Sequence, residues 1–337
     1  MQIRMKAAQI KKYTREIKVS VNEIPISDPN ANEMLVKVKA AAVNPLEILQ
    51  ITGSVKLIQD YRKPFTLGNE CSGVVEKVGS GVRNFKVGDK VYMRLPLDKI
   101  GAFAEYVTVD YKAVAKMPHG YDFVTAAAIP LAGLTAYQGI VEELEAVSGK
   151  TLLITGASGS FGQIAVPVAM SMGLRVIVTG NTRSKEKFLK MGVAKYIDYK
   201  EENYWETLSD IDYVIDTLGA GEFEHELSVL KKGGRLLSLR TGPNRMFAIR
   251  NGFSWFKRAL FTMVGKKYDS AAGKQGKEYR FMFVRSDGEQ LKRVTEIVKK
   301  YKIMPDVDSR IFSLSQINDA LMIVAQGKMN GKIIIRM

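Results

Sequence analysis

The fold of this chain is decided by residues 151–199, in which TLLI (151–154) precedes GASGSFG (156–162) and RVIVT (175–179). The first and last of these runs are short and apolar, which predicts two buried strands. Between them, apolar residues recur at helical spacing from Ile164 to Met172. Glycines in the turn permit positive φ and a close approach of ligand phosphates, at which the following helix directs its partial positive end. Together these elements are typical of a dinucleotide-binding βαβ unit, whereas the glycines alone would be weak evidence.

The loop after the second strand, residues 180–187, indicates which dinucleotide binds. A site for NAD normally has Asp or Glu about 20 residues beyond the glycines, because that carboxylate accepts hydrogen bonds from the ribose 2′-hydroxyl. Here no carboxylate stands at the strand end, and Arg183, Lys185 and Lys187 follow it. Such cations would bind the 2′-phosphate of NADP by charge-assisted hydrogen bonds, so we predict NADPH as the cofactor. The alternative is that these basic residues form a solvated helix start.

The composition is that of a globular protein with room for two packed domains: 337 residues, 46% of them hydrophobic and 25% charged. No run of 18 apolar residues occurs, so we expect no membrane-spanning segment and no membrane partner. The N-terminus lacks the long apolar core of a secretory signal. The single cysteine, Cys71, excludes an internal disulfide and suits the reducing cytoplasm, where we expect the protein to reside.

The net charge of +15 invites a nucleic-acid interpretation, which the distribution of charge does not support. Basic residues are scattered along the chain without a block of five or six, and no nucleic-acid module is recognisable. Attraction of an anionic cofactor, or solubility, explains the charge as well. We therefore expect no nucleic-acid partner.

The segments around the βαβ unit predict two kinds of architecture. From Met5 to about Lys116, short β-branched runs alternate with turn signals, which is typical of a compact, barrel-like β domain. From Ala126 to about Thr241, strand and helix patterns alternate, which predicts a doubly wound parallel sheet.

The C-terminal third begins with a basic, aromatic insertion at residues 244–276. We interpret its helix, around residues 253–264, as an interface or a lid. Beyond the insertion, the patterns predict helices at 289–300 and 315–326 and a closing strand at 332–336.

Six further motifs are distributed over nearly the full length of the chain. They are AVNP (42–45), PFTLGNECSG (64–73), VGDKV (87–91), GAFAEY (101–106), PLAGLTAY (130–137) and the terminal GK (331–332). In this order they resemble the medium-chain dehydrogenase/reductase superfamily, in its zinc-independent quinone oxidoreductase and enoyl reductase-like branch. The resemblance implies an α/β fold with two domains. A Rossmann domain with a doubly wound parallel sheet would span 126–269, and a GroES-like β-barrel catalytic domain would combine 1–125 with 270–337.

The chain departs from zinc-dependent members of this superfamily at the metal ligands. Those enzymes use a cysteine near the position of Pro45, a histidine in a Gly-His-Glu motif and a further cysteine or acid. This chain has Asn69 in place of that histidine, and it lacks the four-cysteine lobe of a structural zinc site. Zinc needs about three or four N, S or O donors, so we predict no metal. Glu70 is then interpreted as a structural carboxylate and Cys71 as a small buried apolar residue.

The resemblance also implies a catalytic residue and a substrate pocket. Asn44 would face the nicotinamide or a substrate oxygen. Some relatives carry a tyrosine five residues further on, where this chain has Leu49, so the proton would come from solvent or from another group such as Tyr61. We expect Tyr61, Phe281 and Phe283 to line the substrate pocket, although a buried strand at a domain or dimer interface would explain each phenylalanine equally well.

The implied cofactor contacts come from both ends of the predicted Rossmann domain and from the C-terminus. Lys187 and Tyr199 match positions that hold the 2′-phosphate in relatives, whereas Tyr199 taken alone is as readily a strand-end aromatic. Thr135 would contact the cofactor across the cleft, and Asn330 matches a cofactor-contacting asparagine. The full expected set is Thr135, Ser158, Gly159, Ser160, Phe161, Asn181, Arg183, Lys187, Tyr199, Leu218 and Asn330.

Without a metal to polarise a carbonyl, the chemistry expected is hydride transfer from NADPH to an electron-poor small molecule, a quinone or an α,β-unsaturated carbonyl compound. The alternative is a non-catalytic NADPH-binding protein with a redox-sensing or interaction role, which the missing tyrosine and metal motivate. A homodimer is a further expectation from the resemblance. The sequence does not indicate the substrate.

Overall fold

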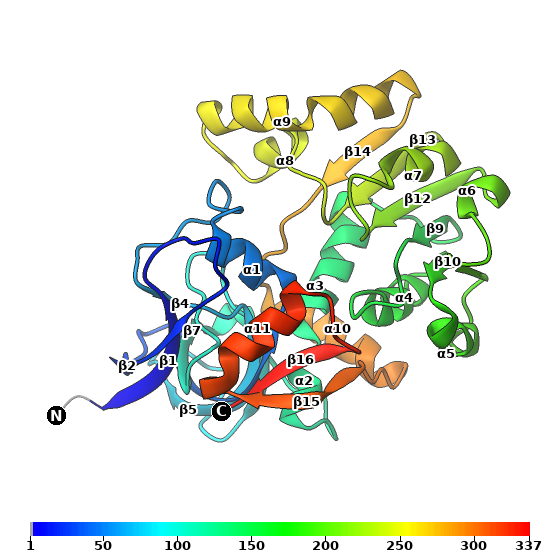
Figure 1. Ribbon diagram of the computed structural model, residues 1–337. Helices are drawn as coiled ribbons and strands as arrows, with labels where there is room; N and C mark the ends of the chain where they lie inside the picture. Colours follow the sequence, from blue (N-terminus) through cyan, green and yellow to red (C-terminus); the bar gives the residue numbers. More distant parts are fainter. Residues whose placement is uncertain (1–2) are drawn as a thin grey trace. The chain divides into compact units, whose positions relative to one another are not determined.

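The computed structural model describes residues 3–337, which form two compact units (Figure 1). The first unit combines the N-terminal part of the chain, to Leu134, with Arg285–Met337, and the second unit is Thr135–Val284. Both junctions lie later in the chain than the predicted domain ends at 125 and 269. The larger difference arises because β14 (Glu278–Phe281) pairs with the sheet of the second unit. Residues 270–284, which the sequence assigned to the barrel domain, therefore belong to the second unit.

The first unit is built on two β-sheets whose strand pairs are all antiparallel except β15 with β16. A seven-stranded sheet has the order β15-β16-β3-β5-β6-β8, with β7 paired to β3, and a three-stranded sheet has the order β2-β1-β4. The strands are β1 (Arg4–Ile10), β2 (Ser20–Pro25), β3 (Glu33–Val43), β4 (Phe65–Thr66), β5 (Glu70–Val78), β6 (Lys90–Arg94), β7 (Tyr106–Asp110), β8 (Val114–Lys116), β15 (Val307–Ser313) and β16 (Lys332–Arg336). The predicted β-rich domain is thus observed.

Helices α1 (Pro45–Thr52), α2 (Phe123–Ala127), α10 (Gly288–Lys300) and α11 (Ile317–Ala325) complete the first unit. The sequence dictates where α10 begins, because the Asp287 side chain accepts a hydrogen bond from the Gln290 backbone N–H at 2.9 Å. Its buried residues, among them Leu291 and Val294, lie on one face. The helices predicted at 289–300 and 315–326 and the strand at 332–336 are confirmed.

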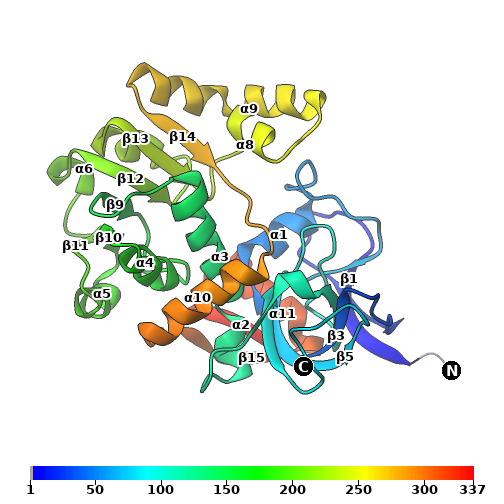
Figure 2. The same ribbon diagram turned by 180° about the vertical axis from the view of Figure 1, so that it is seen from behind.

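The second unit contains a six-stranded, wholly parallel sheet with the order β11-β10-β9-β12-β13-β14. Its other strands are β9 (Thr151–Ile154), β10 (Arg175–Gly180), β11 (Lys195–Asp198), β12 (Ile211–Asp216) and β13 (Leu230–Ser238). Its helices are α4 (Gly162–Ser171), α5 (Lys185–Met191), α6 (Tyr204–Thr207) and α7 (Phe223–Val229), while α3 (Pro130–Gln138) leads into it. Parallel strands need crossover connections, and the helices supply them. Helix α4 packs on β9 and β10 (Figure 2), and α7 packs on β12 and β13 (Figure 1). The predicted doubly wound sheet is confirmed.

The basic, aromatic insertion folds as α8 (Arg245–Arg250) and α9 (Trp255–Lys274), which pack on each other and on β14. The predicted helix is confirmed, but it extends ten residues further than expected. The Phe247 ring lies 5.9 Å from that of Phe261 and 5.1 Å from that of Phe281, centroid to centroid. These rings join α8, α9 and β14 into one aromatic cluster.

Among the described residues, one helical stretch, Phe123–Glu143, has the length and mean hydropathy of a membrane-spanning helix. It was not recognised in the sequence because small and polar residues interrupt its apolar runs. Of its most apolar window, 72% is buried inside the protein, as in a helix of a folded core.

Candidate functional site

The glycine-rich turn between β9 and α4 is a tightly packed backbone cradle. Gly156 has a φ of +63°, and a Cβ there would lie 2.5 Å from Thr217 Oγ1. At Gly162, a Cβ would lie 2.1 Å from the Ala157 carbonyl oxygen. Only glycine fits at these two positions. Gly159, between them, is exposed, so the outer side of the turn is accessible to a ligand.

The turn ends where α4 begins, and the N-cap residue of this helix, Phe161, makes no side-chain capping hydrogen bond. Its first backbone N–H groups and its dipole therefore favour an anion. The four predicted turn residues, Ser158, Gly159, Ser160 and Phe161, all retain exposed surface. The cradle thus fits the pyrophosphate of a dinucleotide.

The turn lies at the point where the strand order of the sheet reverses, since β9 has β10 on one side and β12 on the other. Ligands of open α/β sheets bind outside the carboxyl ends of strands at such a switch point. Backbone hydrogen bonds join the three strand ends: the Ala157 N–H donates to the Thr179 carbonyl at 2.8 Å, and the Thr155 N–H donates to the Ile215 carbonyl at 3.1 Å. Asn181 and Leu218 follow β10 and β12 at the same edge.

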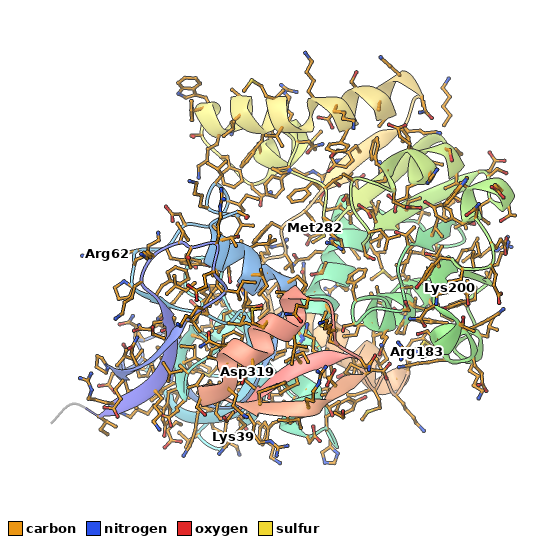
Figure 3. The ribbon with its side chains drawn as sticks, viewed as in Figure 1. Lys39, Arg62, Arg183, Lys200, Met282 and Asp319 are labelled. Atoms are coloured by element: carbon orange, nitrogen blue, oxygen red, sulfur yellow. The ribbon has the colours of Figure 1, made fainter. Side chains whose placement is uncertain are left out.

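Hydrogen bonds hold the basic loop after β10 and the start of α5 in place. Asn181 Oδ1 accepts a hydrogen bond from the Ser184 backbone N–H at 3.2 Å. Lys187, on α5, donates to Gln163 Oε1 on α4 at 3.0 Å, so its ammonium group lies against the helix that carries the glycine turn. Arg183 is exposed (Figure 3), and Tyr199 is 59% exposed. The structure therefore places Lys187 beside α4 and leaves Arg183 and Tyr199 on the surface.

A carboxylate that the sequence did not indicate lies on the neighbouring strand. Asp198 ends β11 directly opposite Gly180, the last residue of β10. A hydrogen bond from Thr182 and another from the Lys200 backbone N–H hold the pKa of this carboxyl below its usual value. The end of β10 is acid-free as predicted, but the adjacent strand supplies a carboxylate that the loop itself binds.

The third loop at this edge is fixed by Asp216, the last residue of β12. Asp216 Oδ1 accepts hydrogen bonds from the backbone N–H groups of Leu218 at 2.6 Å and Gly219 at 2.7 Å. Its other oxygen accepts a hydrogen bond from the Ser238 hydroxyl at 2.5 Å. Leu218, a predicted cofactor contact, is 46% exposed on this loop.

A second carboxyl group lies beneath the same edge. Glu226, on α7, is fully buried and accepts a hydrogen bond from Thr155 Oγ1 at 2.7 Å. Burial, together with the nearby charge of Asp216, raises the pKa of Glu226 to about 9. Glu226 is therefore protonated at neutral pH.

In the first unit, Asn44 lies between β3 and α1 and is 3% exposed. Its Nδ2 donates to Glu70 Oε1 at 3.0 Å, and its Oδ1 accepts a hydrogen bond from Lys332 Nζ. Its backbone N–H donates to Glu47 Oε2 at 2.6 Å, which forms the capping box of α1. These contacts fix the Asn44 amide from both of its ends.

Glu70 and Lys332 form a buried ion pair with an Nζ to Oε1 distance of 2.9 Å. Glu70 Oε2 accepts a hydrogen bond from the Leu131 backbone N–H at 2.7 Å. Lys332 reaches this position because β16 pairs with β3, with Ile333 opposite Val43. Glu70 is thus the structural carboxylate predicted, whereas the sequence assigned Lys332 no role.

Glu47 is completely buried, and it connects α1 to β5. Its Oε1 accepts hydrogen bonds from the backbone N–H of Asn69 at 3.1 Å and from Asn69 Nδ2 at 2.6 Å. Asn69 Nδ2 also donates to Gln50 Oε1 at 3.0 Å. Burial raises the pKa of Glu47 to about 7.

Arg94, on β6 opposite Glu70, is a further buried cation that the sequence did not indicate. Its Nη1 donates to the Leu95 carbonyl, but Nε and Nη2 have no hydrogen-bond partner among residues 3–337. Burial lowers the pKa of Arg94 to about 10, and the charges of Glu47 and Glu70 act in the opposite direction. Arg94 therefore remains a cation at neutral pH.

The positions that correspond to zinc ligands do not fit a metal. Pro45 offers no donor, the Asn69 amide is bound to Glu47, and the Glu70 carboxylate is bound to Lys332. Cys71 is fully buried, and burial raises the pKa of its thiol. Within residues 3–337, no group of three or more His, Cys, Asp or Glu residues is placed to hold a metal ion.

The remaining predicted residues are divided between the units. Tyr61 is half-buried in the first unit, where its hydroxyl donates to the Leu97 carbonyl at 2.7 Å. Asn330 is exposed, and its backbone N–H donates to Asp308 Oδ2 at 2.8 Å. Thr135, Phe281 and Phe283 belong to the second unit. Their assembly into one pocket with Asn44 stays a prediction.

Known protein families match two parts of the chain. Residues 30–119 match the family model of the alcohol dehydrogenase GroES-like domain, and residues 191–335 match that of the zinc-binding dehydrogenase. The chain is 31% identical over 323 residues to a 2-methylene-furan-3-one reductase from Solanum lycopersicum, covering 93% of this chain and 74% of the relative. It is 29% identical to a chloroplastic NADPH-dependent alkenal/one oxidoreductase from Arabidopsis thaliana, covering 93% and 74%. The solved quinone oxidoreductase from Coxiella burnetii superposes with a TM-score of 0.82 at 26% identity, covering 99% of this chain and 100% of the other.

Proposed function

Because this chain belongs to the medium-chain dehydrogenase/reductase superfamily, we propose that it is an NADPH-dependent reductase of quinones or α,β-unsaturated carbonyl compounds. The observation that carries the proposal is the cradle at Gly156 and Gly162, which lies at the switch point of a parallel sheet with Lys187 beside it. The names of the two curated relatives, a furanone reductase and an alkenal/one oxidoreductase, support the substrate class.

The cofactor is held, in this proposal, by three loops at one sheet edge. The uncapped first turn of α4 binds the pyrophosphate, and the Lys187 ammonium group pairs with the 2′-phosphate. Leu218 contributes an apolar contact, since the backbone hydrogen bonds to Asp216 hold its loop in place. Arg183 and Tyr199 are both exposed. We assign Tyr199 to the 2′-phosphate from the resemblance, and Arg183 from its place in the basic loop.

Bound NADPH supplies a hydride, and the acceptor also takes up one proton, which gives a hydroquinone from a quinone or a saturated ketone from an enone. Asn44 is assigned to the nicotinamide amide or the substrate oxygen. The Lys332 and Glu70 contacts would hold its amide ready for that contact without reorganisation. Leu49 has no dissociable proton, so we assign protonation of the product to solvent.

Zinc independence is part of the proposal, and the lack of a fitting donor set around Asn69 and Glu70 supports it. In place of a metal, the Lys332 ammonium group is the cation next to Glu70. An acceptor that is already electron-poor does not require a Lewis acid. We further propose the homodimer that the resemblance implies and the cytoplasmic location that the single cysteine suggests.

The experiment is NADPH oxidation by the purified chain with a panel of quinones, alkenals and enones, with the corresponding saturated ketones as controls. We expect turnover with at least one electron-poor acceptor and none with the saturated ketones. The product of an enone, identified by mass spectrometry, should be two hydrogens heavier. Added chelator should leave the rate unchanged.

The alternative, an NADPH-binding protein without catalysis, predicts a different result. NADPH would bind with micromolar or better affinity, but no acceptor would accelerate its oxidation. That combination would sink the reductase proposal while leaving the cofactor site intact.

A further inference from the structure

The α8–α9 insertion concentrates positive charge. Residues 245–274 contain seven Lys or Arg residues and a single acidic residue, Asp269. Asp269 already makes a hydrogen bond within the insertion region, because its Oδ1 accepts one from Asn244 Nδ2 at 2.7 Å. The excess positive charge of the folded protein is therefore unevenly distributed, with a concentration in this insertion.

One face of α9 is exposed along the whole helix and is divided into two halves. Eight of its exposed residues share this face, because they are spaced by one, three or four positions along the helix. They are Trp255, Phe256, Ala259, Met263, Lys266, Lys267, Ser270 and Lys274, and we call them the α9 stripe. The first four are apolar, and three of the last four are lysines. Trp255 is 80% exposed, Met263 70% and Phe256 63%, which is unusual for three large apolar side chains on one helix face.

Packing of the opposite face of α9 keeps the α9 stripe on the surface of the protein. Phe261, Gly265 and Ala272 are buried, at the same helical spacing. The backbone at Gly265 approaches the chain so closely that a Cβ there would lie 2.4 Å from Asn244 Cβ. Phe261 packs against Phe253 with ring centroids 5.4 Å apart. Rotation of α9 to bury the tryptophan would break these contacts.

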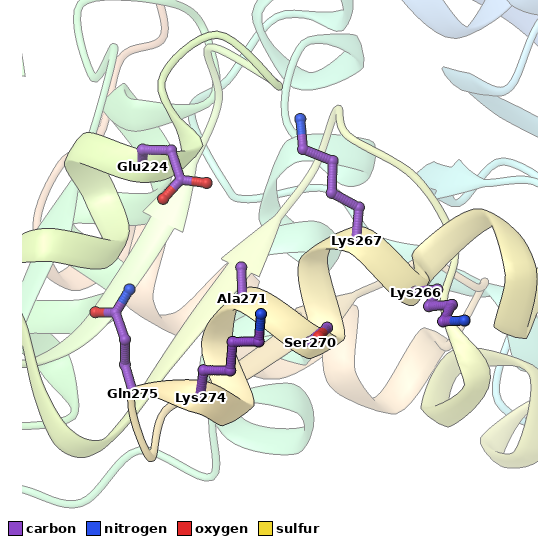
Figure 4. A pocket seen from close by; sticks show the side chains of 7 residues that line it. All are labelled: Glu224, Lys266, Lys267, Ser270, Ala271, Lys274 and Gln275. Carbon is purple, nitrogen blue, oxygen red and sulfur yellow. The ribbon is translucent and has the colours of Figure 1, made fainter.

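The cationic half of the stripe lines an open groove of about 800 Å³ (Figure 4). Lys266, Lys267 and Lys274 contribute three ammonium groups, whereas Glu224, on α7, is the one carboxylate in its lining. Ser270 and Gln275 add groups that can donate hydrogen bonds. The groove is therefore suited to phosphate groups carried on a surface.

We propose that the α9 stripe docks this protein onto an anionic lipid bilayer. A helix that lies in a membrane interface presents Trp, Phe and other apolar residues together with Lys, and binds through both apolar burial and charge. The apolar half of the stripe enters the headgroup region, and the three lysines bind lipid phosphates in the groove. A polyanion such as nucleic acid would satisfy the lysines but leave Trp255, Phe256 and Met263 exposed to water. This docking is peripheral and differs from membrane spanning, and it gives the protein a membrane partner that the sequence did not predict. It stands or fails independently of the reductase activity.

The first test is cosedimentation of the full chain with phosphatidylcholine vesicles and with vesicles containing phosphatidylcholine and phosphatidylserine. We expect binding only to the anionic vesicles, weakening as salt is added. Insertion of the α9 stripe into the bilayer can be followed by the fluorescence of Trp255. The chain has one other tryptophan, Trp205, which stacks on His225. In a Trp205→Phe protein, we expect the emission of Trp255 to shift to the blue with anionic vesicles and to be quenched by brominated lipids.

Two variants separate the halves of the stripe. Lys266→Gln, Lys267→Gln and Lys274→Gln together should lower the affinity for anionic vesicles roughly 100-fold, at about fivefold for each charge near the surface. Trp255→Ser, Phe256→Ser and Met263→Ser together should abolish sedimentation. Matched controls are Lys11→Gln, Lys12→Gln and Lys18→Gln for charge, and Val87→Ser with Val147→Ser for exposed apolar residues. Circular dichroism and NADPH binding confirm that each variant is folded.

Three results would overturn the proposal. The first is absence of binding to anionic vesicles. The second is equal loss of binding in the stripe variants and in the matched controls, which would make the effect one of net charge or general apolarity. The third is concentration-dependent self-association that the Trp255, Phe256 and Met263 changes abolish, without vesicle binding, which would assign the stripe to a second copy of this chain.

Discussion

The ammonium group of Lys332 lies 2.9 Å from the carboxylate of Glu70, and both side chains are buried. Removal of the cation alone would leave an uncompensated buried charge. We therefore expect Lys332→Met to lower the free energy of unfolding by about 3–5 kcal/mol. Urea denaturation followed by circular dichroism would measure this loss.

The matched double variant, Lys332→Met with Glu70→Gln, removes both charges and should recover much of the stability. The Glu70→Gln amide can still accept a hydrogen bond from the Leu131 backbone N–H. If Lys332→Met alone unfolds at the same urea concentration as the parent, the ion pair does not stabilise the first unit.

Gly162→Ala should abolish NADPH binding. The new Cβ would lie 2.1 Å from the Ala157 carbonyl oxygen and 2.5 Å from Ala157 Cα, so the turn must open. Such overpacking typically costs about 1–3 kcal/mol. Gly221→Ala is the control, since its Cβ would meet nothing within 4 Å. Fluorescence titration with NADPH would distinguish them, and equal binding by the two variants would contradict the cradle.

Lys187→Ala should weaken NADPH and spare NADH. A charge-assisted hydrogen bond to the 2′-phosphate accounts for about 10- to 100-fold in affinity, and NADH has no such phosphate. The comparison is with Lys190→Ala on the same helix, where the lysine is exposed and pairs with Glu186 at 2.5 Å. Titration calorimetry of both variants with NADPH and with NADH gives the four affinities that are compared. A parallel fall in NADH affinity would show that Lys187 acts on the turn and not on the phosphate.

The parts of the fold that could be predicted from the sequence are those with local signals. The apolar run of β9, the glycines and the helical period of α4 lie within 21 residues, and they were sufficient for the βαβ unit. β14 was assigned to the wrong domain because its four residues, EYRF, do not indicate which sheet the strand joins. The strand gains its place only by pairing with β13.

The buried network around Asn44 could be predicted only in part. Asn44 and Glu70 stand in recognisable motifs, but Lys332 meets them through the register of β16 on β3, 288 residues along the chain from Asn44. Asp198 was missed for the same reason, since it reaches the basic loop through the pairing of β11 with β10. Contacts set by strand register leave no mark on the local sequence.

Glu226 should make the second unit less stable as the pH rises. Its pKa is about 9 in the folded protein, chiefly because of burial, against an ordinary value of 4.5. Between these values the folded chain keeps a proton that the unfolded chain has released, so the unfolded state binds fewer protons. The free energy of unfolding therefore falls with increasing pH across this window, and the stabilisation is complete only below the unfolded pKa.

Glu226→Gln removes the titration but keeps an acceptor for the Thr155 hydroxyl and adds an N–H group that can donate to Asp216. We expect this variant to be more stable than the parent at about pH 8 and to show a flatter dependence down to about pH 5. Both tryptophans, Trp205 and Trp255, belong to the second unit, so fluorescence during urea denaturation follows this unit. Glu224→Gln, an exposed change on the same helix, should leave the slope as in the parent. If the free energy of unfolding changes with pH equally in Glu226→Gln and in the parent, the Glu226 carboxyl is ionised in the folded protein. The buried pair of Glu226 and Asp216 would then need a cation that the described residues do not supply.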